Sequence, residues 1–127
     1  MNAFARVWPG IAIGGCLFHL CQALFRQCGM HGLTRLLSHN TEFRRLLRET
    51  CCLALHPAEN IEKVWNKYVK PKYKALSKRK SLRNFANEID QFRTYFQRTW
   101  ITKIGPAKFS CFNEVIATTN ALECYHG

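Results

Sequence analysis

Three amphipathic stripes between residues 40 and 100 constrain the fold of this chain more than any other feature of its sequence. In each stripe, apolar side chains recur every three or four residues, which is the spacing of one face of an α-helix. We therefore expect three helices that each bury one face. The stripes consist of Phe43, Leu46, Leu47, Thr50, Cys51 and Ala54; of Ile61, Val64, Trp65, Tyr68 and Val69; and of Leu82, Phe85, Ala86, Ile89, Phe92 and Phe96.

Capping residues and helix breakers divide the stripes into separate helices. Residues 40–41 (Asn-Thr) predict the start of the first helix, and residues 56–57 (His-Pro) predict its end. Pro71 is expected to break or bend the second helix, because proline lacks the N–H that a helix interior needs. The third helix should run to about Trp100, before a turn at residues 105–106 (Gly-Pro).

The short apolar run at residues 11–18 is bounded by Pro9-Gly10 and by the start of a helix expected over residues 19–30. A run of this length fits a buried strand best. A lone buried strand leaves its own backbone groups unpaired, and 127 residues make one domain at most. The predicted fold class is therefore α/β but mostly helical: one strand plus helices, as a piece of a larger domain. The alternative is a small all-helical domain in which residues 11–18 form a loop.

The chain is strongly basic, with 19 Lys and Arg against 8 acidic residues and a net charge of +11. Such an excess favours polyanionic partners, either nucleic acid or an anionic membrane surface. The densest segment contains no acid, and its tyrosines, Tyr68 and Tyr73, are placed to stack on exposed bases. The alternative is an ordinary solvated helix face. The candidate DNA-binding residues are Lys67, Lys70, Lys72, Lys74, Lys78, Arg79, Lys80 and Arg83.

Two further features bear on where the chain works. Residues 78–80 (Lys-Arg-Lys) match a short nuclear import signal. No run reaches the ~18 apolar residues that a membrane span needs, and no secretory signal is evident. The seven cysteines are an odd number, so we expect reduced thiols in a reducing compartment. These features predict a nuclear protein with no membrane partner.

Two small constellations are candidates for chemistry. Cys16 and His19 have a spacing that would suit two zinc ligands or a nucleophile–base pair; the plainer interpretation is a buried thiol and a histidine at a helix start. Near the other end, Asn120, Glu123 and His126 recur every three residues and would suit a hard cation. Further zinc ligands would have to come from Cys51, Cys52, Cys111, Cys124 or His126.

Taken together, these segments resemble the catalytic domain of Mutator-like (MULE) transposases. Residues 4–9 and 15–23 are similar to that family's Phe-Pro … Gly-Cys-x-Phe-His-x-x-Gln segment. Residues 92–101 are similar to its Phe-x-x-Tyr-Phe-x-x-Thr-Trp-Ile segment, and residues 118–126 to its Thr-Asn-Asn-x-x-Glu-x-x-His segment. The three segments occur in the family's order and cover essentially the whole chain.

The resemblance implies a partial RNase H-like domain with a helical insertion over residues 1–127. Residues 1–30 would be the end of the RNase H-like core, residues 40–100 the insertion, and residues 109–127 a helix that carries the final catalytic residue. The intact family enzyme uses two Asp and one Glu to hold Mg²⁺ or Mn²⁺ and to cut and join DNA. Glu123 matches the catalytic, metal-binding Glu, whereas Cys16, His19, Asn120 and His126 match motif residues beside the site.

The departures from that family decide the predicted function. Both catalytic aspartates would lie upstream of this sequence, and its single aspartate, Asp90, falls elsewhere. Ala117 and Thr119 also replace the family's Arg and first Asn. We therefore expect a transposase fragment that is inactive alone and holds no cofactor, with DNA, the missing N-terminal part or other transposase subunits as partners. The alternatives are a co-opted DNA-binding or interaction module and a small helical zinc-binding protein.

Overall fold

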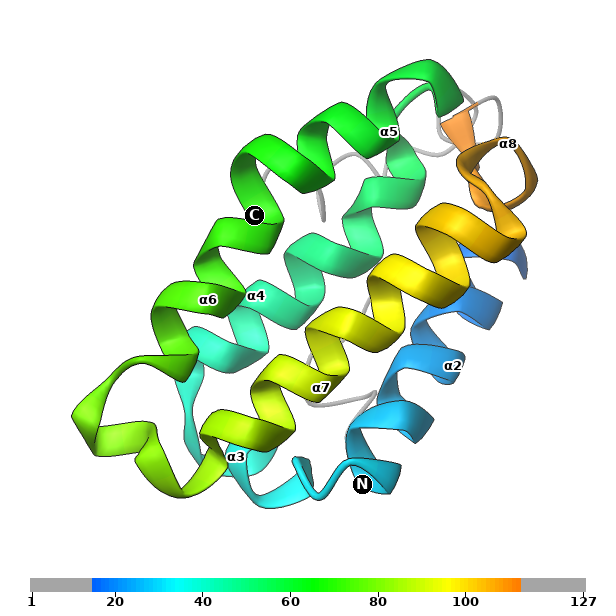
Figure 1. Cartoon of the computed structure of the whole chain (residues 1–127). Coiled ribbons are helices and arrows are strands. Elements are labelled where there is room, and N and C mark those ends of the chain that lie inside the picture. Colours follow the sequence, from blue (N-terminus) through cyan, green and yellow to red (C-terminus); the bar gives the residue numbers. More distant parts are fainter. Residues whose placement is uncertain (1–14, 113–127) are drawn as a thin grey trace.

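The structure is a computed structural model that describes residues 15–112, and its regular elements in that range are all helical. Four helical rods lie side by side and alternate in direction, joined by short connections (Figure 1). They are α2, then α4 with η1, then α5 with η2 and α6, and finally α7 with η4. The bounds are α2 Gly15–Met30, α3 Thr34–His39, α4 Thr41–Cys52, η1 Leu53–Leu55, α5 Ala58–Val64, η2 Trp65–Val69, α6 Lys70–Ser77, η3 Lys80–Phe85, α7 Ala86–Phe96, η4 Gln97–Ile104 and α8 Pro106–Phe109.

The ends of the rods follow the punctuation in the sequence. The Asn40 side chain accepts a hydrogen bond of 2.8 Å from the backbone N–H of Phe43, which caps α4 at the position predicted from the sequence. The α4 rod ends before Pro57, as predicted. Gly32 and Gly105 have φ of +74° and +90°, so each turns the chain in a conformation that other residues rarely adopt. The predicted turn at residues 105–106 is thereby confirmed.

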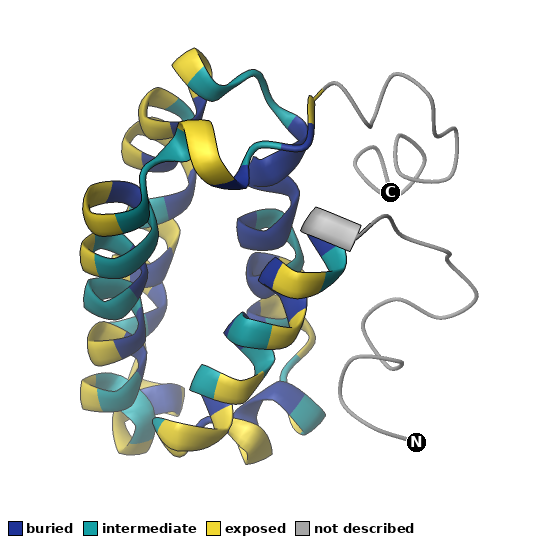
Figure 2. Ribbon diagram, turned by 90° about the vertical axis from the view of Figure 1, so that its right-hand side faces the viewer, coloured by how far each residue is buried: buried dark blue, intermediate teal, exposed yellow. Residues whose placement is uncertain are grey.

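An aromatic cluster fills the centre of the bundle. The rings of Trp65 and Phe96 lie 4.6 Å apart, and Phe92 packs 5.9 Å from Tyr73 and 6.5 Å from Phe43. All five rings are fully buried, and the buried residues line the inner sides of the rods (Figure 2). The three predicted stripes thus face one shared core, with the exceptions of Tyr68, which is 56% exposed, and of Ala86, which is outside the core cluster.

The second stripe departs from prediction at a π-helical segment. The chain remains helical through Pro71, because the turn before it, η2, is π-helical: the backbone N–H of Lys70 bonds to the carbonyl of Trp65, five residues back. This wider turn brings Val69 onto the core side and takes Tyr68 off it. The Trp65 Nε1 donates a 2.6 Å hydrogen bond to Oε1 of Gln97, the first residue of the second π-helical segment, η4.

The predicted α/β class and partial RNase H-like fold are wrong for the described chain. Residues 15–18, the end of the expected strand, form the first turn of α2, and no strand is present between residues 15 and 112. The physical reason is that a helical stripe begins inside the supposed strand and buries its face against α4. That stripe consists of Leu17, Leu20, Cys21, Leu24 and Cys28, all buried. The described residues have the all-helical class of the alternative, but residues 15–18 are helical and do not form the loop that it expected.

Candidate nucleic-acid interface

The basic segment divides into two sets because α6 presents different flanks to its neighbours. On the flank of α6 that faces α4, Lys72 makes an ion pair of 2.9 Å with Glu49, and Arg79, just after the end of α6, makes one with Glu42. Glu42 and Glu49 are seven residues apart on α4 and therefore share a face. The hydrogen bond from Arg79 is the main reason that the pKa of Glu42 lies below its usual value. These two cations are paired with carboxylates of α4 at the surface of the bundle.

A second set of lysines runs along another flank of the same rod. Successive members are four, three, four and four residues apart, so on either side of the π-helical turn they follow one side of the rod. The π-helical η2 between Lys63 and Lys70 shifts the earlier members around the rod relative to the later ones. At about 1.5 Å per residue, the ridge is roughly 20 Å long. Four of its members are exposed, Lys70 is partly buried, and none makes an ion pair with a residue that the structure describes. We call this set the lysine ridge: Lys63, Lys67, Lys70, Lys74 and Lys78.

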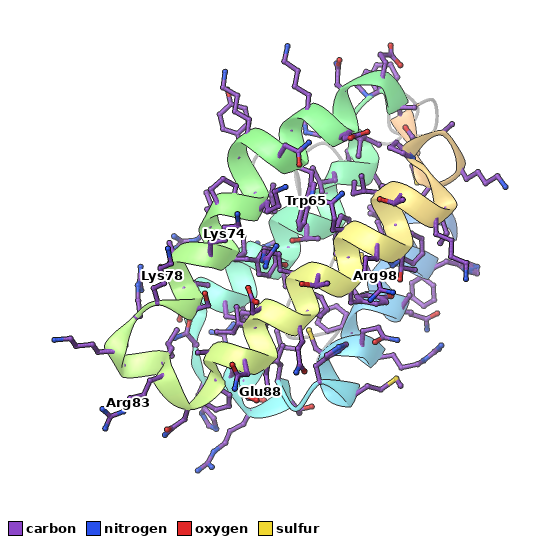
Figure 3. All side chains as sticks on the ribbon, viewed as in Figure 1. Trp65, Lys74, Lys78, Arg83, Glu88 and Arg98 are labelled. Carbon is purple, nitrogen blue, oxygen red and sulfur yellow. The ribbon has the colours of Figure 1, made fainter. Side chains whose placement is uncertain are left out.

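The turn between α6 and α7 extends the basic surface. Lys80 and Arg83 are exposed there, while Leu82 between them is buried and anchors the turn to the core. Figure 3 shows Lys74 and Lys78 on the α6 rod, with Arg83 at the adjoining turn. The three residues of the predicted nuclear import signal differ in their surroundings. Lys78 and Lys80 are exposed without an ion-pair partner in the described chain, whereas Arg79 is paired with Glu42.

The two tyrosines of the segment differ in what they can contact. Tyr68 is exposed, and the Nζ of Lys67 lies 5.4 Å from its ring centroid. Tyr73 is fully buried and shares a 2.6 Å hydrogen bond with Thr50, so it cannot stack on a base. Burial raises the pKa of Tyr73 well above its ordinary value. The expected interleaving of aromatic rings with lysines therefore reduces to Tyr68.

The candidate metal residues do not form a site in the described part of the chain. No three His, Cys, Asp or Glu side chains gather there as a metal would require. Cys51, Cys52 and Cys111 are buried among core residues, and burial, with a hydrogen bond to Cys21, raises the pKa of Cys51 well above its ordinary value. His19 is exposed on α2. The side chain of Cys16 and the whole of Asn120, Glu123, Cys124 and His126 lie outside the described residues.

Asp90, the single aspartate of the chain, is exposed on α7 and pairs with Arg93 at 2.7 Å. It therefore has the role of a surface ion-pair partner, in agreement with its place outside the motifs that resemble a transposase. Within residues 15–112, no helix is long and apolar enough to cross a membrane.

Lys63 is the member of the ridge that the sequence analysis missed. It lies outside the acid-free segment, next to Glu62, which is why counting charges did not find it. A search for lysines at helical spacing would have found it, because it lies four residues before Lys67. Conversely, nothing near Lys72 or Arg79 in the sequence shows that they are paired, since their partners lie 23 and 37 residues away.

Comparison with known proteins gives no independent indication of function. This chain matches no protein-family model, no curated protein and no solved structure. The candidate function therefore depends on the geometry and charge of the basic surface.

Proposed function

We propose that this helical bundle binds DNA through backbone phosphates along the lysine ridge. The observation that carries the proposal is the contrast on one rod: the cations facing α4 are paired with Glu49 and Glu42, whereas the ridge lysines have no acidic partner among residues 15–112. A line of unmatched ammonium groups about 20 Å long repels itself unless anions cover it. Phosphates of a nucleic acid supply such anions at close spacing, with release of counterions.

The composition of the ridge indicates what kind of binding to expect. Lysine ammonium groups are flexible point charges that suit phosphate oxygens, whereas base edges are read mainly by Arg, Asn and Gln with paired hydrogen bonds. The ridge itself contains only lysines. The proposed binding is therefore governed by the phosphate backbone, depends steeply on salt and discriminates little between sequences.

The resemblance to MULE transposases is the reason to name DNA as the polyanion and the nucleus as the compartment. In this proposal the chain is derived from such a transposase, and Glu123 corresponds to its final metal-binding residue. Two-metal strand cleavage needs several carboxylates around Mg²⁺ or Mn²⁺, and Asp90 is engaged with Arg93. We therefore propose binding without strand cleavage; Mg²⁺-dependent nicking of DNA by the purified chain would contradict that part.

The test is a charge-matched pair of triple variants in a DNA-binding titration. One variant replaces Lys67, Lys70 and Lys74 by Gln, and the control replaces Arg26, Arg35 and Lys108, three exposed cations on other elements, by Gln. Binding of a fluorescent DNA duplex is followed by anisotropy from about 50 to 200 mM salt. Both variants lose the same net charge, so the difference between them reports the surface that makes the contacts.

The ridge variant should bind at least tenfold more weakly at about 50 mM salt, and its salt slope should fall by about 2.7 if each lysine neutralises one phosphate. The control should retain most of the affinity and most of the slope. Equal losses in the two variants would mean that only net charge matters, and the lysine ridge would then be abandoned as the interface.

A further inference from the structure

A second surface lies on the other side of α7 from the α6 rod, where a groove separates α7 and η4 from the end of α2. Its volume is about 720 Å³, within the range of ligand-binding clefts. Figure 1 shows α7 between α6 and α2, and Figure 3 shows Arg98, on η4, on the side of that rod that faces α2. The residues that matter for its chemistry are Gln27, Met30, His31, Tyr95, Arg98 and Lys103.

The floor of the groove is held in place by the core. The His31 ring packs against Phe92 at 6.2 Å and Tyr95 at 6.0 Å, and its Nδ1 hydrogen-bonds with the carbonyl of Gln27 at 2.9 Å. The Tyr95 hydroxyl accepts a 2.9 Å hydrogen bond from Nε1 of Trp100. These contacts fix both rings before any partner arrives, so binding here would cost little ordering of the floor.

The rim of the groove combines positive charge with an exposed apolar side chain. Arg98 and Lys103 are exposed and make no ion pair with any residue between 15 and 112. Asp90, the carboxylate on this rim, is already held by Arg93. Met30 is 72% exposed, the most exposed of the large apolar side chains in the described residues. A partner would therefore meet net positive charge beside a flexible thioether.

We propose that this groove docks an acidic, amphipathic segment of another protein. Met, Tyr and Arg are the side chains enriched where proteins meet, and Met adapts its shape to an apolar partner. Glu or Asp side chains of the partner complement Arg98 and Lys103, while an apolar residue covers Met30. A nucleic acid fits less well, because Arg98 and Lys103 are fewer cations than the five of the lysine ridge, and because the exposed Met30 beside them suits an apolar side chain.

The methionines make a direct test possible, since the chain has only two, Met1 and Met30. Protein labelled with ¹³C at the methionine methyl groups gives one signal for each, and a Met30→Leu variant assigns them. The full chain is titrated with a short peptide that carries Glu and Leu at helical spacing, with the same peptide carrying Lys in place of Glu, and with a DNA duplex.

The Glu peptide should shift the Met30 signal in a saturable way, and the Lys peptide should leave it in place. An Arg98→Gln/Lys103→Gln variant should bind the Glu peptide roughly fivefold more weakly or worse, as expected for two exposed cations. A Lys67→Gln/Lys74→Gln variant, matched in charge, should bind the peptide as the parent does. This control separates the groove from the lysine ridge, so failure at one site leaves the other proposal standing.

Three results would overturn the proposal. The first is a Met30 signal that does not move with the Glu peptide. The second is an equal response to the Glu and Lys peptides, which would indicate apolar contact without charge recognition. The third is a Met30 shift by the DNA duplex that the Arg98→Gln/Lys103→Gln variant abolishes, which would make the groove part of the nucleic-acid surface instead.

Discussion

Two flanks of the same rod carry the same kind of side chain and have opposite environments. Lys72 and Arg79 point toward α4 and are held by Glu49 and Glu42, whereas Lys74 and Lys78 belong to the lysine ridge and have no such partners in the described chain. A basic segment in a sequence is therefore not one surface. The neighbouring helix, which lies far away in sequence, decides which cations remain available to an anionic ligand.

The difference between the paired and the unpaired cations depends on the orientation of α6. The largest effect is therefore expected from removing the side chain that holds α6 in place. Tyr73 is fully buried between α4 and α7, with its hydroxyl bonded to Thr50. We expect Tyr73→Ala to lower the free energy of unfolding by about 3–5 kcal/mol, as for other buried aromatic side chains. Tyr73→Phe should cost about 1–3 kcal/mol, because it leaves the hydroxyl of Thr50 with one partner fewer.

Urea titrations followed by circular dichroism measure both changes. Tyr68→Ala, on an exposed ring of the same rod, is the control and should change stability by less than about 0.5 kcal/mol. A Tyr73→Ala variant as stable as the parent would show that Tyr73 does not fix the rod.

Single substitutions of two lysines, two residues apart, compare the unpaired flank with the paired flank directly. Lys74→Gln should weaken DNA binding about fivefold at roughly 50 mM salt and reduce the salt slope by about 0.9, since one phosphate contact is lost. Lys72→Gln should change the affinity by less than about twofold, because Glu49 already neutralises that cation. Anisotropy titrations at several salt concentrations distinguish the two. The reverse order of effects would place the DNA on the α4 side.

Removing the acidic partners on α4 should make the cations of the paired flank available to DNA as well. In a Glu42→Gln/Glu49→Gln variant, Arg79 and Lys72 lose their partners and become available to phosphates. We expect DNA affinity to rise by about twofold to tenfold at low salt, with a steeper salt slope. Replacing Glu59 and Glu62, exposed acids on α5, gives a control with the same gain in charge. If both double variants tighten binding equally, the effect is one of net charge alone.

The smallest expected effect concerns the Arg79–Glu42 pair and pH. The pKa of Glu42 is lowered in the folded state, so the pair's contribution to stability is complete above the unfolded pKa near 4.5. That contribution is lost as the pH falls through the lower folded-state pKa. The difference in urea midpoint between the parent and Arg79→Gln should therefore shrink from about pH 6 to about pH 3. A constant difference would mean that Arg79 acts through packing and not through Glu42.

What the sequence predicted well depends on contacts close along the chain. The start of α4 follows from one side chain, Asn40, and the buried face of α4 follows from helical spacing within a dozen residues. The supposed strand failed because an apolar run of eight residues fits a strand or the start of a helix equally well. Only the continuation of the stripe through Leu24 and Cys28 distinguishes the two.

Only the part of the candidate interface that depends on nearby residues could be predicted from the sequence. Charge density located the α6 rod, and helical spacing defines the ridge, including Lys63. The pairing of Lys72 and Arg79 required knowing that α4 packs beside α6, which no local pattern contains. The sequence analysis wrongly placed Tyr68 on the buried face of the second helix. The hydrogen bond of η2, which spans five residues, changes the phase of the helix, and such a turn has no simple sequence signature.

That π-helical segment also sets the direction in which the basic side chains of α6 point. Each residue of an α-helix turns the chain by about 100°. Deleting one residue within Trp65–Val69 would therefore rotate every later position of the rod relative to α5. Tyr73 would leave the core, and the flank that now meets Glu42 and Glu49 would turn away from them. One extra residue in a single helical turn thus determines which of these cations meet the carboxylates of α4 and which are presented to a ligand.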